Sequence, residues 1–60
     1  GKLEAQKEDI LVLLRDLGEV SPQVEEIILS QREEQRLKIW LKLAARAESM
    51  EEFVDALQTK

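Results

Sequence analysis

The chain has 60 residues, with 13 acidic and 9 basic side chains, a formal net charge of −4, no cysteine and no histidine. These counts exclude a disulfide framework and a Cys/His zinc site. A domain this short buries only roughly 60% of the surface that its unfolded chain exposes, so we expect association with another chain to complete the fold.

The first predicted element is an amphipathic helix over residues 3–17. It should end at Gly18, because glycine adopts the left-handed conformation after a last helical turn without steric cost. Leu11 and Val12 lie off the apolar face of this helix, Val12 nearly opposite it, and either residue could form a second contact surface. The residues that share the apolar face at 3.6 residues per turn are Leu3, Ile10, Leu13, Leu14 and Leu17.

Serine residues mark the predicted starts of the remaining helices. Ser21 is a favourable N-cap, and Pro22 follows it at the first helical position, where the missing N–H costs nothing. Ser30 and Ser49 each precede a glutamate by three residues, which is the spacing of a capping box. Without a histidine to act as base, we interpret these serines as helix caps rather than nucleophiles. The three helices are predicted over residues 22–29, 31–47 and 50–58.

The predicted fold class is all-α, a single domain over residues 1–60 that forms a small bundle of three main helices plus one short helix, completed by self-association. The chain starts with glycine, so we expect a fragment of a longer protein or a small protein that carries a residue left by a tag. With no cysteine, no signal peptide and no long apolar run, we expect it to be cytoplasmic, without a membrane partner. The residues expected to point inward from the last three helices are Val24, Ile27 and Ile28, then Leu37, Trp40, Leu41, Ala44 and Ala47, and finally Met50, Phe53, Val54 and Leu57.

The inventory for catalysis is poor. The chain has no histidine, cysteine or tyrosine and only two glycines, so a glycine-rich phosphate loop is absent. Adjacent carboxylates on a helix point about 100° apart and do not form a shared site. They occur as four pairs: Glu8/Asp9, Glu25/Glu26, Glu33/Glu34 and Glu51/Glu52. We expect no enzyme activity, no catalytic residue, no cofactor and no metal site.

A basic stripe lies along the third predicted helix. Lys38, Lys42 and Arg46 are four residues apart in succession, and a phosphate backbone could lie along them. Against this, the chain is acidic overall, and Glu34 precedes Lys38 by four residues, the favourable orientation for a local ion pair. We expect nucleic acid not to be a partner of this segment alone and keep the stripe as an alternative.

Association is the third class of function. Trp40 is the only tryptophan, and it either anchors the core or forms a contact hot spot, a role in which tryptophan is enriched. Ile39 and Leu43 widen the apolar arc of the third helix, and on a monomer they would leave an exposed apolar patch. The predicted partner interface therefore consists of Leu11, Val12, Ile39, Trp40 and Leu43.

One succession of features resembles a known family. A leucine-rich helix from Ile10 to Leu17 is followed by Gly18 and by a serine and a proline, and a second leucine-rich helix ends in small residues and Ser-Met-Glu-Glu-Phe. This resembles the small C-terminal helical domain of Rpn-type recombination-promoting nucleases, relatives of PD-(D/E)XK transposases. The matching positions are Ile10 to Leu17, Gly18, Val20 to Pro22, Val24 with Ile27, Leu37 to Ala47, and Ser49 to Phe53.

The resemblance implies a module that assembles or regulates a nuclease whose active site lies in another domain. No Asp/Glu-x-Lys triplet occurs in this chain, so no catalytic residue carries over. We expect a non-catalytic module that forms a homo-oligomer, a dimer in the simplest case. The alternative is a small protein that docks on the full-length nuclease and holds it inactive.

Overall fold

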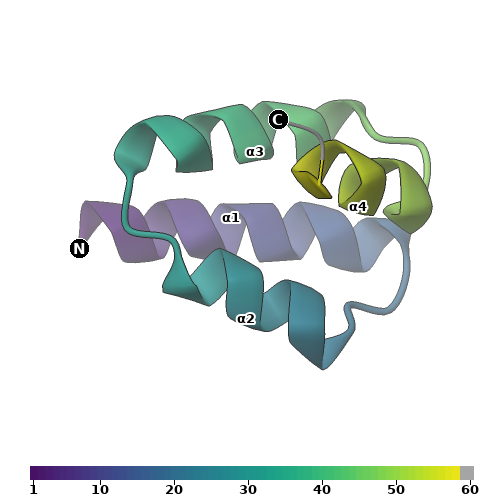
Figure 1. Ribbon diagram of the computed structural model, residues 1–60, viewed down its shortest axis with the longest axis horizontal. Coiled ribbons are helices and arrows are strands. Elements are labelled where there is room, and N and C mark those ends of the chain that lie inside the picture. The colour runs from purple at the N-terminus through teal and green to yellow at the C-terminus, as the bar shows by residue number, and fades with distance from the viewer. Residues whose placement is uncertain (59–60) are drawn as a thin grey trace.

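Four helices make up the part of the chain that the computed structural model describes, residues 1–58 (Figure 1). They are α1 (Lys2–Leu17), α2 (Pro22–Ser30), α3 (Glu34–Arg46) and α4 (Met50–Gln58). No β-strand occurs among these residues, so the predicted all-α class is confirmed. The predicted domain also included residues 59–60, which lie outside the described residues.

The helices α1 and α3 run in the same direction, with α2 antiparallel to both (Figure 1). Two contacts agree with this arrangement. The Lys2 ammonium lies 3.5 Å from a Glu34 carboxylate oxygen, which joins the N-terminal ends of α1 and α3. The Lys7 ammonium donates to the backbone carbonyl of Leu29 at 2.7 Å, which joins α1 to the C-terminal end of α2. Helix α1 is therefore covered from two sides.

In the core, α2 and α3 pack on α1, and α4 packs on α3. The chain has a radius of gyration of 10.2 Å, close to the value of about 10.4 Å expected for a compact domain of this length. The buried side chains come from all four helices, so the single chain already closes a core. They are Ile10, Leu11, Leu14, Val24, Ile28, Leu37, Trp40, Ala44 and Phe53.

Leu11 corrects the predicted apolar face of α1. The sequence pattern placed this residue outside the core, but only 4% of it is exposed, whereas Val12 is 48% exposed. Lys7 is one turn before Leu11 and reaches α2, so this side of α1 faces α2. Because α1 packs against both α2 and α3, it buries a wider arc than a helix with one neighbour would. Helix α2 covers the part of this arc that contains Leu11.

Two of the three predicted serine caps are present. The Ser21 hydroxyl accepts from the Val24 N–H at 3.3 Å and begins α2, with proline at the first position. The Ser49 hydroxyl accepts from the Glu52 N–H at 3.2 Å, and Glu52 Oε1 accepts in return from the N–H of Glu48 at 2.9 Å. These serines hold the starts of α2 and α4.

The third predicted cap, Ser30, is wrong. Ser30 is the last residue of α2, and α3 begins at Glu34, three residues later than predicted, with no side-chain hydrogen bond at its cap. Gln31 Oε1 instead accepts from the N–H groups of Arg32 and Glu33, each at 3.1 Å. The side-chain amide of Gln31 thus accepts from two backbone N–H groups in the segment between α2 and α3. These hydrogen bonds stabilise a non-helical segment there, so α3 begins later.

Two further expectations on conformation and burial are also wrong. Gly18 ends α1 as predicted, but its φ of 164° and ψ of −162° are extended rather than left-handed. Ile27 was expected to point inward and is 47% exposed. Helix α2 has nine residues and packs chiefly on α1 through Val24 and Ile28, so a residue 100° away from Ile28 stays outside the contact.

Candidate interaction surface

The predicted interface residues separate into three groups in the structure. Val12 and Ile39 are exposed, at 48% and 54%, and Leu43 is half-buried. Leu11 and Trp40 are core residues and offer no free surface to a partner. The structure thus gives Trp40 the role of core anchor, and it leaves Val12 and Ile39 as the exposed members of the predicted interface.

Val12 lies on the outer side of α1, two residues from both Ile10 and Leu14, which are fully buried. Residues two apart on a helix point about 200° apart, so Val12 is opposite the core face. Its neighbours at three and four residues distance on the helix surface are all exposed: Glu8, Asp9, Arg15 and Asp16. We call Val12 with these four residues the acidic patch, whose formal charge is −2.

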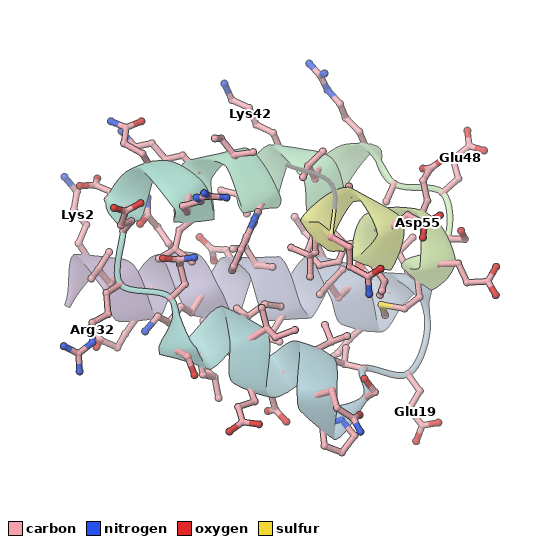
Figure 2. The ribbon with its side chains drawn as sticks, in the orientation of Figure 1. Lys2, Glu19, Arg32, Lys42, Glu48 and Asp55 are labelled. Atoms are coloured by element: carbon pink, nitrogen blue, oxygen red, sulfur yellow. The ribbon has the colours of Figure 1, made fainter. Side chains whose placement is uncertain are left out.

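Ile39 has the corresponding position on α3. It follows the fully buried Leu37 by two residues and so points away from the core. Its neighbours at three and four residues distance are Gln35, Arg36, Lys42 and Leu43, of which the first three are exposed. We call Ile39 with these four residues the basic patch, whose formal charge is +2. Figure 2 shows Lys42 extending from α3 away from the other helices.

The predicted basic stripe is exposed along its length, but its first member is paired. Lys38 Nζ lies 3.8 Å from Glu34 Oε2, which is the local pair expected from the sequence. The same Glu34 oxygen lies 3.5 Å from the Lys2 ammonium. Glu34 therefore offsets part of the positive charge at the start of α3, and the excess positive charge lies further along, at Lys42 and Arg46.

Helix α2 carries two more exposed apolar residues, Ile27 at 47% and Leu29 at 49%. Leu29 was not among the predicted interface residues. The sequence does indicate that some apolar residues of this helix are exposed, because the helix is too short to bury four large ones on one side: Val24, Ile27, Ile28 and Leu29. Ile27 and Leu29 are on opposite flanks of the buried Ile28 and do not form one patch.

The described residues 1–58 contain no pocket and no group of three or more acidic side chains placed to hold a metal ion. One carboxyl has a shifted pKa. The N-terminal amine of Gly1 lies 3.1 Å from Glu4 Oε1, and its hydrogen bond, a backbone hydrogen bond and its charge lower the pKa of Glu4. This group is fully exposed at the end of α1, and its shift reflects helix-end electrostatics.

None of the helices in residues 1–58 has the length and apolar character that crossing a membrane requires. Comparisons of the chain with protein-family models, with curated protein sequences and with solved structures found no match.

Proposed function

We propose that this domain is a non-catalytic association module that binds another chain through the outer faces of α1 and α3. The observation that carries this proposal is that Val12 and Ile39 remain about half exposed although the core closes without them. The exposed neighbours of each are polar or charged. An exposed apolar side chain at such a position gains free energy when a partner covers it.

The magnitude of this gain indicates a weak association for the isolated chain. Full burial of a valine or isoleucine side chain is worth about 1.5–3 kcal/mol, so covering the exposed half of both residues supplies about 2 kcal/mol. Exposed charge pairs add about 0.2–1 kcal/mol each. Because association also costs several kcal/mol in lost freedom, we expect association of the isolated chain to become detectable only toward millimolar concentration.

The resemblance to the C-terminal domain of Rpn-type recombination-promoting nucleases suggests which protein the module serves. In this proposal the domain pairs copies of such a nuclease and has no active site of its own. The alternative is that the domain docks on the full-length nuclease and restrains it. The same two outer faces would then bind the larger chain.

The test is the mass of the purified chain in solution from micromolar to millimolar concentration, measured by sedimentation equilibrium. We expect mass to rise with concentration, and we expect the double variant V12Q/I39Q to remain monomeric. Leu11 is not substituted, because a polar residue there would unfold the core. The matched control is Ile27→Gln, which removes an equally exposed isoleucine on α2 and should leave the association unchanged.

Two results would count against this proposal. A wild-type chain that stays monomeric at millimolar concentration excludes self-association and leaves docking on a larger partner. If Ile27→Gln abolishes the association and V12Q/I39Q does not, the interface lies on α2 instead.

Exposure of Lys42 and Arg46 makes nucleic acid the second candidate. Fluorescence anisotropy with a labelled duplex tests it, since binding through this stripe would weaken with salt and be lost in K42Q/R46Q. The overall charge of −4 leads us to expect no binding at physiological salt.

A further inference from the structure

We propose that the association is head-to-tail, with the acidic patch around Val12 of one copy docked on the basic patch around Ile39 of a second copy. This inference rests on the proposed function and specifies its partner and its geometry. The occupant of each patch is thus the other patch on a neighbouring copy of the same chain.

Charge complementarity carries the choice of a second copy. The two patches have the same construction, an exposed β-branched residue surrounded by four neighbours on one helix face, but their formal charges are −2 and +2. Opposite charges at the rim of an interface favour encounter and fix the pairing, while like charges that face one another oppose it. A symmetric pairing through α1 would bring together two acidic patches, and one through α3 would bring together two basic patches.

The geometry of the fold makes the pairing directional. Helices α1 and α3 lie side by side and bury residues in a shared core (Figure 1). Val12 and Ile39 lie opposite the buried residues of their own helices, so each points away from that core. Each copy then presents one patch of each kind. Contacts between unlike surfaces leave a free patch at each end and continue to a ring or to an open chain of copies.

Mixing two single-site variants tests this arrangement. Val12→Gln removes the apolar centre of the acidic patch and leaves the basic patch intact, and Ile39→Gln does the reverse. We expect each variant alone to associate about fivefold more weakly than the wild type. An equimolar mixture should recover the wild-type affinity but stop at two copies, because each pair retains one complementary contact and no second one.

Charge reversal provides an independent measurement. D9K/D16K changes the acidic patch from −2 to +2, and R36E/K42E changes the basic patch from +2 to −2. Each of these double variants should weaken the association. The chain with all four changes should recover it, because both patches then have the opposite sign. Raising the salt from 50 to 500 mM should weaken the wild-type association severalfold. Circular dichroism and urea unfolding establish that all of these exposed variants stay folded.

The outcomes separate the pairing geometry from the proposed function. If the wild type associates but the mixture behaves as the sum of its components, the head-to-tail pairing is overturned and the association module stands. If Val12→Gln alone has no effect, the α1 face lies outside the contact, which also overturns it. A wild type that is monomeric at every concentration overturns the head-to-tail pairing and leaves, of the proposed function, only docking on a larger partner.

Discussion

Adjacent residues on α1 provide the sharpest test of the fold, because the structure buries Leu11 and exposes Val12. Truncating a buried leucine to alanine removes its packing and leaves a cavity, which costs about 2–5 kcal/mol. A domain of this length has a stability of roughly 3–9 kcal/mol, so Leu11→Ala should remove a large fraction of it. Val12→Ala removes an exposed side chain and places a stronger helix former there, so we expect a change within about 0.5 kcal/mol.

Urea unfolding followed by circular dichroism and by the fluorescence of Trp40 measures both variants. With a slope of about 1 kcal/mol per molar urea, Leu11→Ala should lower the midpoint by about 2 M or more, and Val12→Ala should leave it within about 0.5 M. The measurements are made at low micromolar concentration, where a midpoint independent of concentration shows that association does not contribute. Equal losses for the two variants, or a larger loss for Val12→Ala, would refute the placement of α2 against α1.

Three further predictions concern helix ends. Gly18→Ala should stabilise the domain by about 0.4–1 kcal/mol in urea unfolding, because the backbone there is extended and a Cβ would meet no atom within 4 Å. A loss of stability would instead indicate that residue 18 has a left-handed backbone. Ser21→Ala and Ser49→Ala should each cost about 0.5–2 kcal/mol and Ser30→Ala close to nothing, so equal costs at all three positions would contradict the observed caps. By NMR titration the Glu4 carboxyl should have a pKa below its ordinary value, and acetylating the N-terminal amine should raise that pKa. Because the folded-state pKa is lowered, the contribution of Glu4 to stability is present above the ordinary pKa and is lost as the pH falls through the lowered one.

Local patterns in the sequence predicted the helices well. The fourth helix was predicted over residues 50–58, and α4 has the same bounds; the second was predicted one residue short at its end. These elements depend on caps and on the 3.6-residue period, which act within a few residues. The start of α3 was the weakest prediction, because Ser30 and Glu33 fit a capping box and the competing amide of Gln31 was not considered.

Candidate interface residues were predicted less well than the helices. Leu11 and Val12 are adjacent, both lie off the predicted apolar face of the first helix, and both were predicted to lie on the surface. Ile27 was assigned to the core and lies outside it. In each case the phase of the helix was known, but the width of its buried arc was not, because this width depends on how many helices pack against it.

The helical class, the order of the helices and most of their ends could be predicted from the sequence, because these properties arise from interactions between residues close in the chain. Which apolar residues remain available to a partner depends on how the helices pack against one another. The arrangement of α2 and α3 around α1 covers Leu11 and leaves Val12 exposed, while Ile39 points outward from α3. Burial depends on contacts between residues distant in the chain, and the pair of oppositely charged patches emerges only when those contacts are in place.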